Sequence, residues 1–170
     1  EEVEEEEPFV VGGDGFHVPR CSEQMPGTGW MRGQATAKWR PGIQRGQRYV
    51  ETSWLTPLKN GFSRAIPLRC LPAFTEKSVP CEGVEPRTEV ATGVVMLKWL
   101  RESMDKAGRA KQWLVALYDG SYDTLAFWSA LPTRTVALVR TARNRCLYHL
   151  PGQDAHGNCK YGEQAKHPFE

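Results

Sequence analysis

The sequence predicts an α/β fold with a mixed β-sheet, on the basis of three observations. Residues 48–58 and 62–71 are rich in β-branched and aromatic side chains and flank Asn60-Gly61, a dipeptide typical of tight hairpin turns. Residues 86–108 carry apolar side chains at helical spacing. Residues 112–120 and 134–140 are short, nearly all-apolar runs, which are typical of strands buried on both faces of a parallel sheet.

The remaining elements are weaker signals in the sequence. Residues 9–18 are apolar and predict a first strand, whereas residues 19–47 show neither helical nor strand periodicity. We expect residues 19–47 to form a long irregular segment, and a segment of that length inside a compact domain is usually functional. A second linker covers residues 72–86, and a short helix is expected over 121–131.

The ends of the two helices also have sequence signals. Pro86 suits the first turn of the long helix, and Gly108 suits its C-terminal end. The short helix begins with a cap at Ser121 or Asp123 and ends before Pro132. The apolar positions that predict the long helix are Val90, Val94, Leu97, Leu100 and Met104.

The predicted order is therefore strand, strand, strand, helix, strand, helix, strand. A hairpin followed by a right-handed crossover in this order matches the ribonuclease-H-like mixed sheet, β-β-β-α-β-α-β, here truncated before its last helix. That fold has three antiparallel strands, then a parallel extension with helices on both faces. A flavodoxin-like arrangement is less favoured, because no helix separates the first three strands.

The charge distribution predicts a basic folded part. Six of the 20 acidic residues lie in the first seven positions, so residues 8–170 carry 14 acidic and 22 basic side chains. We expect residues 1–7 to be a solvated acidic lead-in, and the basic remainder favours a polyanionic partner. Five scattered cysteines without a C-x-x-C pair do not suit a disulfide framework or a zinc ribbon. No secretion signal or apolar run long enough to cross a membrane is present, so a soluble intracellular protein is expected.

Two aspartates are associated with predicted strands. Asp14 lies within the first, and Asp119 closes the strand at 112–120. In the predicted sheet these strands are parallel neighbours, so both carboxylates reach the same sheet edge, where open α/β sheets bind ligands. Oxygen ligands without thiol or imidazole favour Mg²⁺ or Mn²⁺, and such a pair of ions can activate the attack on a phosphodiester. The competing interpretation is that each aspartate only caps a turn or helix.

Other kinds of site have less support. A dinucleotide or phosphate loop around Gly12-Gly13-Asp14-Gly15 lacks the remaining glycine or Gly-Lys-Ser/Thr pattern, and the chain continues as the extended "FHVPR". No G-x-S-x-G elbow or comparable nucleophile motif is present. A metal-dependent site is therefore the favoured hypothesis.

Five blocks taken together resemble the DDE-class transposases of bacterial insertion sequences. They are "DGFHVPRCSEQMPGTGW", "QRYVETSWL", "GFSRAIPL", "LYDGSYDTLAFWSALP" and "VALVRTARNRCLYHLP", and the similarity covers roughly residues 9–170. The resemblance implies a ribonuclease-H-like catalytic domain whose Asp-Asp-Glu triad binds two Mg²⁺ (or Mn²⁺) ions. By position, Asp14 matches the first catalytic and metal-binding aspartate and Asp119 the second, whereas Asp123 is expected to cap the next helix.

The third residue of that triad has no match in the chain. In the family it is a glutamate on a helix after the last strand and an insertion, whereas Glu163 and Glu170 lie in a segment that resembles the approach to that insertion. The resemblance thus implies an incomplete catalytic domain at 8–150, followed at 151–170 by the start of an insertion or linker. Such a fragment is expected to bind metal weakly and to be inactive by itself.

The resemblance also implies DNA as the partner, both as transposon ends and as target, in a cytoplasmic, nucleoid-associated bacterial protein. It leaves a homodimer open for the intact protein. Basic side chains would neutralise phosphates, and the interleaved Trp30, Trp39 and Tyr49 would stack on bases. The expected DNA-binding residues are Arg20, Arg32, Lys38, Arg40, Arg45, Arg48, Arg140, Arg143 and Arg145.

Two alternative functions remain open at this point. The first is a non-catalytic DNA-binding or assembly remnant of a decayed transposase. The second is another ribonuclease-H-like nuclease that acts on RNA–DNA hybrids or junctions.

Overall fold

The computed structural model describes residues 7–32 and 42–141 of the chain. It divides into a compact unit, Glu1–Val139, and a second unit, Arg140–Glu170, of which only residues 140 and 141 are described. The first unit contains all of the following elements. In chain order they are β1 (Phe9–Pro19), β2 (Gly29–Arg32), β3 (Ile43–Leu55), β4 (Ala65–Pro72), α1 (Glu89–Lys106), β5 (Leu114–Tyr118), a 3₁₀ turn (Gly120–Tyr122), α2 (Leu125–Trp128) and β6 (Thr135–Val139).

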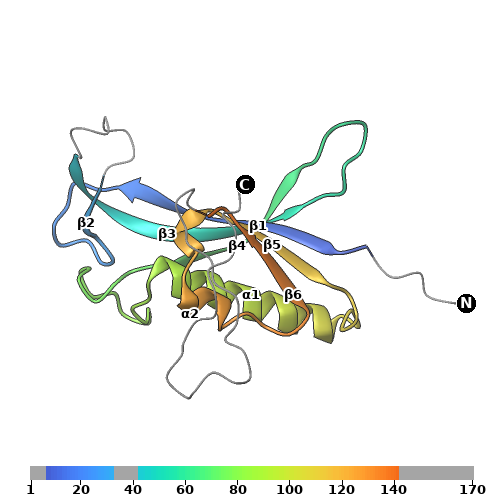
Figure 1. Ribbon diagram of the computed structural model, residues 1–170. Coiled ribbons are helices and arrows are strands. Elements are labelled where there is room, and N and C mark those ends of the chain that lie inside the picture. Colours follow the sequence, from blue (N-terminus) through green and yellow to red (C-terminus); the bar gives the residue numbers. More distant parts are fainter. Residues whose placement is uncertain (1–6, 33–41, 142–170) are drawn as a thin grey trace, which may run out of the picture. The chain divides into compact units, whose positions relative to one another are not determined.

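The strands form one mixed sheet in the order β2-β3-β1-β5-β6, and β4 pairs with the other part of β3 (Figure 1). Strand β3 is antiparallel to β1, β2 and β4. Strand β5 is parallel to β1, and β6 is parallel to β5. The predicted α/β class with a mixed sheet is confirmed, and so is the parallel pairing of the two strands that lead to Asp14 and Asp119.

Helix α1 begins and ends on local signals. Thr88 is its N-cap, and the Thr88 hydroxyl accepts a hydrogen bond from the backbone N–H of Ala91 at 3.2 Å. Gly108 has a φ of +79°, the left-handed conformation that ends helices, as predicted. Pro86 lies before the helix and not in its first turn, because the hydroxyl cap at Thr88 sets the start three residues later.

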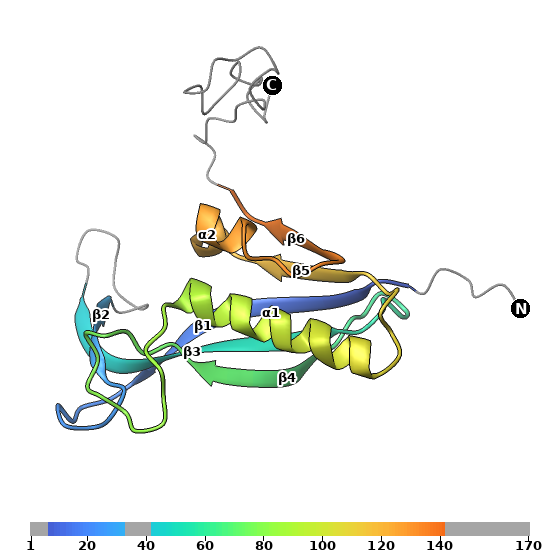
Figure 2. The ribbon, with the colours of Figure 1, turned by 90° about the horizontal axis from the view of Figure 1, so that it is seen from below.

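The core lies between α1 and one face of the sheet (Figure 2). Leu97 and Leu100 of α1 pack with Leu114 and Ala116 of β5 and with Phe127 of α2. A second buried cluster joins Val50, Ala73 and Met96. In the described part of the chain both helices therefore cover the same face, whereas the fold predicted from the sequence has helices on both faces.

The hairpin between β3 and β4 is confirmed. Asn60 and Gly61 both have positive φ, 52° and 80°, which is the conformation that a tight primed turn requires. Lys59 and Phe62 form an isolated bridge, so the paired strands end at Leu55 and Ala65 and a narrow arm projects from the sheet (Figure 1). The strand before the turn begins at Ile43, five residues earlier than expected.

Two other expectations need correction. Part of the segment expected to be irregular forms strand β2, which pairs with the early part of β3. The helix expected over 121–131 is only four residues long, because a 3₁₀ turn precedes it. The cap of α2 is Thr124, and the Asp123 carboxylate instead accepts a hydrogen bond from the indole of Trp128 at 3.0 Å.

A candidate carboxylate site at the end of strand β5

The site lies where β5 ends and β1 continues. The last paired residues of these parallel strands are Gly13 and Tyr118, so Asp14 and Asp119 are the next residues on two adjacent strands. The Asp14 carboxylate is exposed and accepts a hydrogen bond from the N–H of Gly15 at 2.8 Å. Both carboxylates therefore lie at the carboxyl end of β5, the edge that the sequence analysis expected.

Asp119 also organises the turn that follows it. Its carboxylate caps the 3₁₀ turn by accepting hydrogen bonds from the Ser121 N–H at 2.9 Å and the Ser121 hydroxyl at 2.6 Å. The capping interpretation of Asp119 is thus correct for the local structure. The cap does not exclude a second role, because the carboxylate is exposed and has further lone pairs.

A third carboxylate, Glu89, comes from the first turn of α1. Its Oε1 atom lies 3.2 Å from the Ser121 hydroxyl, so Ser121 stands between Glu89 and Asp119. Glu89 was not among the site residues predicted from the sequence. The available signal was its place directly after the Thr88 cap, but acidic residues are common in that first turn because they complement the helix dipole.

Two glycines on β1 leave room for Glu89 and for the Tyr118 ring to lie close to the strand. A Cβ atom on Gly15 would lie 2.4 Å from the carboxyl carbon of Glu89, and one on Gly13 would lie 2.2 Å from the Tyr118 ring. Since side chains alternate along a strand, Gly13 and Gly15 face α1, while Asp14 faces the other side. The absent side chains therefore admit Glu89 next to the Asp14 backbone.

Tyr122 packs against Tyr118 and Phe127, within electrostatic range of the same carboxylates. It is wholly buried, and a Cβ on Gly93 would lie 2.7 Å from its ring. Burial raises its pKa above the usual range, and the nearby charges of Glu89, Asp119 and Asp14, together with Tyr118, add to that shift. Gly93 lies one turn after Glu89 on the same side of α1, so the tyrosine ring packs next to the start of the helix.

Arg48 provides the positive charge of the site. Its Nη1 atom lies 3.0 Å from Glu89 Oε2, and its Nε donates a hydrogen bond to His17 Nε2 at 2.8 Å. His17 and Arg48 are directly opposite on β1 and β3. Burial lowers the pKa of His17, Arg48 lowers it further, and Glu89 partly opposes both. His17 is therefore held in the neutral form that can accept this hydrogen bond.

The donor set suits a hard cation. Among the residues that the structure describes, no three Asp, Glu, His or Cys side chains are close enough together to hold a metal ion. Three carboxylates without thiols are nevertheless the ligands that Mg²⁺ and Mn²⁺ prefer, and Arg48 already places a cation against Glu89. The donor types therefore fit, but their present spacing does not, because Asp14 faces the other side of β1 and would have to reach an ion beside Glu89 around the end of β5.

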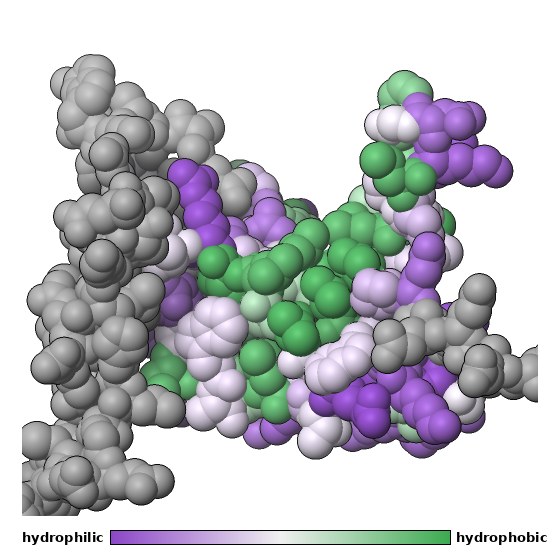
Figure 3. Space-filling model, turned by 45° about the vertical axis from the view of Figure 1, so that its right-hand side comes forward, coloured by the Kyte–Doolittle hydropathy of each residue, from purple (hydrophilic) through white to green (hydrophobic). Residues whose placement is uncertain are grey.

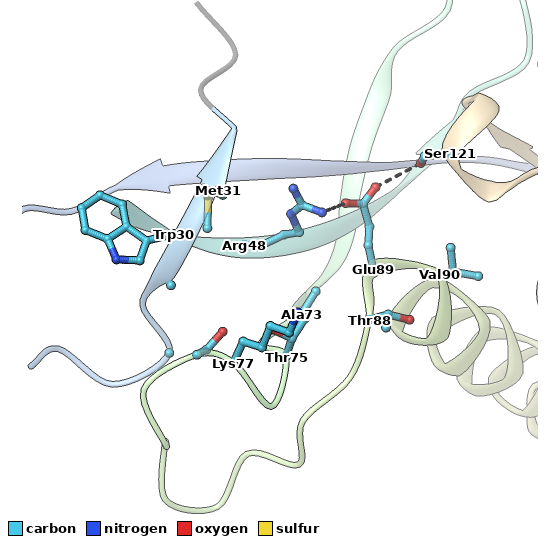
Figure 4. Close-up of a pocket in the computed structure, with 13 residues that line it drawn as sticks. Trp30, Met31, Arg48, Ala73, Thr75, Lys77, Thr88, Glu89, Val90 and Ser121 are labelled. Carbon is cyan, nitrogen blue, oxygen red and sulfur yellow. Dashed lines mark hydrogen bonds and ion pairs between the residues drawn. The ribbon is translucent and has the colours of Figure 1, made fainter. Parts of the chain in front are cut away.

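A groove of about 470 Å³ leads away from the carboxylates (Figure 4). Glu89 and Ser121 line one end, Arg48 lies on its floor, and Lys77 lies on the segment that joins β4 to α1. Gly29, Trp30 and Met31 of β2 line the opposite end. Trp30 was among the aromatic residues expected to contact bases, whereas Lys77, Gly29 and Met31 were not predicted from the sequence, because their place depends on how the loops pack.

The expected DNA-binding residues have different surroundings in the structure. Arg48 reaches the carboxylates, whereas Arg20 donates to Gln47 at 3.0 Å and Arg45 donates to the backbone oxygen of Glu23 at 2.9 Å. Arg45 also lies over the ring of Trp30, which is 66% exposed. Arg32 is in β2 and Arg140 is exposed directly after β6. The other expected residues, Lys38, Arg40, Arg143 and Arg145, lie outside the described residues, as does Trp39.

Tyr49, expected to stack on bases, instead packs within the protein. Its ring stacks on Phe16 at 5.7 Å and meets the edge of Phe74 at 5.5 Å.

Within the described ranges, no helix is long and apolar enough to cross a membrane. Comparisons with protein-family models, with curated proteins and with solved structures found no match.

Proposed function

We propose that the protein is a metal-dependent nuclease with a ribonuclease-H-like fold, and that Asp14, Glu89 and Asp119 hold the metal. The sheet order β4-β3-β1-β5-β6, antiparallel for the first three strands and parallel for the rest, supports the fold. The observation that carries the function is the contact of Glu89 and Asp119 with one Ser121 hydroxyl, at the end of the strand that pairs with the β1 residues before Asp14.

The chain's own groups have distinct roles in this proposal. The three carboxylates provide negative oxygen ligands, and Ser121 orients two of them. Arg48, 3.0 Å from Glu89, offsets part of their mutual repulsion. A divalent ion held by these ligands supplies Lewis-acid activation of a phosphodiester and of the attacking water. The groove beside Glu89 provides room for the nucleic-acid backbone.

The position of Glu89 also favours a nuclease over a transposase. The transposase triad takes its glutamate from a helix after the last strand, whereas Glu89 lies on the helix between β4 and β5. An RNA–DNA hybrid is the first substrate to test, because the ribonuclease-H-like nuclease alternative acts on such hybrids. Transposition remains the second candidate, favoured by Asp14 on β1 and Asp119 directly after the paired strand β5.

One set of substrates tests both candidates. The full chain is incubated with Mg²⁺ or Mn²⁺ and an end-labelled RNA–DNA hybrid, duplex DNA, duplex RNA or single-stranded RNA of the same sequence, and the products are separated on denaturing gels. We expect cleavage of the hybrid that requires the metal and is lost in Asp14→Asn. Joining of a 3′-hydroxyl DNA end to a plasmid would favour the transposase instead. Salt-sensitive binding without any cleavage would favour a non-catalytic module.

A further inference from the structure

Arg48 has an unusual place for a cation. Its guanidinium lies between His17 and Glu89, with the two contacts at 2.8 Å and 3.0 Å. A guanidinium has five N–H donors, and these two contacts use two of them. The Arg48 side chain is 35% exposed and lines the groove, so the remaining donors are accessible from it (Figure 4).

His17 fixes the direction of the guanidinium. Its Nε2 accepts from Arg48, so the proton of the neutral ring is on Nδ1. That Nδ1 atom is buried and has no hydrogen-bond partner within the described residues. A buried donor without a partner is unfavourable for folding. The histidine is therefore better explained by what it does for Arg48 than by a stabilising effect of its own.

We propose that Arg48 is a catalytic residue that binds a substrate phosphate beside the carboxylates, and that His17 is the positioning residue that holds it there. This inference rests on the proposed nuclease function. A planar guanidinium matches phosphate oxygens better than any other side chain, and it remains charged at all relevant pH values. Three carboxylates would repel a phosphodiester, and a fixed cation within the cluster offsets that repulsion.

The same position has a second consequence. Arg48 and a divalent ion compete for the Glu89 carboxylate, because both neutralise the same oxygens. Removal of the arginine charge should therefore weaken nucleic-acid binding and strengthen metal binding. A residue with a purely structural role would weaken both together, so the two measurements separate the roles.

The binding experiment uses the full chain and a fluorescein-labelled RNA–DNA hybrid in Ca²⁺, to limit cleavage. Fluorescence anisotropy over a range of KCl concentrations should show that Arg48→Gln loses about 10-fold in affinity, as for a lost charge-assisted hydrogen bond. The slope of log Kd against log salt should fall by about 1, since one phosphate contact is removed. Arg64→Gln, on the hairpin arm, is the matched control and should change neither value.

Metal affinity is measured separately by calorimetric titration of Mg²⁺ into the protein without nucleic acid. Arg48→Gln should bind Mg²⁺ several-fold more tightly than wild type. Arg48→Lys should keep the salt slope but lose part of the affinity for the hybrid, because it lacks the planar fork. His17→Gln should lower the cleavage rate while leaving the salt slope unchanged. Thermal unfolding of each variant verifies that it folds.

Several results would overturn the proposal. One is a wild-type salt slope and hybrid affinity in Arg48→Gln, and another is a parallel loss of Mg²⁺ and hybrid affinity. If the wild-type protein binds the hybrid without cleaving it, the nuclease function fails. The salt slope of Arg48→Gln then still tests whether Arg48 contacts a phosphate. If the wild-type protein does not bind the hybrid at all, both proposals fail.

Discussion

The carboxylate end of the sheet and the hairpin arm are both exposed, but different interactions hold them. At the carboxylate end, Asp119, Ser121, Glu89, Arg48 and His17 form one continuous chain of side-chain contacts. In the arm, Thr56–Arg64, a backbone bridge between Lys59 and Phe62 forms the tip, and the Thr56 and Ser63 side chains bond only to the arm's own backbone. Leu58 and Phe62 of the arm are 75% and 78% exposed.

The arm is visible in Figure 3 as a projection with apolar and hydrophilic side chains, next to a wider apolar surface. An arm held by its turn and by local backbone contacts should tolerate changes in its exposed apolar side chains, Leu58 and Phe62. The carboxylate end should not tolerate such changes, because its charged side chains hold one another in position.

Asp119→Asn is expected to have the largest effect. The carboxamide keeps the size of the side chain and can still accept from Ser121, but it removes the negative charge. We expect the metal-dependent cleavage rate of the hybrid to fall more than about 100-fold, beyond the usual loss for a residue that only supports a metal ligand. Asp123→Asn is the matched control, since Asp123 bonds the Trp128 indole, and its rate should remain close to wild type.

Two neighbouring glycines on β1 provide a stability test. In Gly13→Ala the new methyl group would lie 2.2 Å from the Tyr118 ring, which is buried. We expect the free energy of unfolding to fall by about 1–3 kcal/mol, the usual range for overpacking. In Gly12→Ala the nearest atoms belong to Leu55, at 3.7 Å or more. Chemical denaturation should show a much smaller change for this control, and equal losses would contradict the packing described for Tyr118.

His17 predicts a pH dependence of stability. Its pKa in the folded protein is lowered, chiefly by burial and also by Arg48, so between that value and the unfolded value of about 6.5 the unfolded chain binds more protons. The free energy of unfolding should therefore fall as the pH decreases below about 6.5. The free energy of unfolding of His17→Gln, measured by denaturation across this range, should fall less with decreasing pH than that of the wild type. An identical profile for both proteins would contradict the shift.

The arm should give the smallest effects. Leu58→Ser and Phe62→Ser replace exposed side chains, and we expect changes within about 0.5 kcal/mol in unfolding and an unchanged cleavage rate. Gly61→Ala should cost more than either, about 1 kcal/mol, because its φ is +80°. If the serine variants abolished cleavage instead, the arm would belong to the substrate-binding surface.

The sequence was informative where the signal was local. Hairpin residues Asn60 and Gly61 and the periodic apolar face of α1 each specify their element within a few residues. The placement of Asp14 and Asp119 on neighbouring backbones could also be predicted, because parallel pairing of β1 and β5 ends at Gly13 and Tyr118. That inference needed only the order of the elements.

The missed features depend on tertiary packing. Glu89 reaches Ser121 only because α1 starts beside β1 and Gly15 leaves room for its carboxylate. Strand β2 is four residues long, too short to show alternation. Arg20 and Arg45 looked equivalent to Arg48 in the sequence, but the 20–28 loop provides hydrogen-bond partners for Arg45, whereas Arg48 faces α1.

The most direct measurement is the rate of hybrid cleavage by Glu89→Gln compared with Glu102→Gln, at saturating Mg²⁺. Both glutamates are on α1, but Glu102 is exposed near the other end of the helix. The proposed site predicts a loss of more than about 100-fold for Glu89→Gln, as for a metal ligand, with Glu102→Gln close to wild type. Wild-type cleavage by Glu89→Gln would contradict the three-carboxylate site.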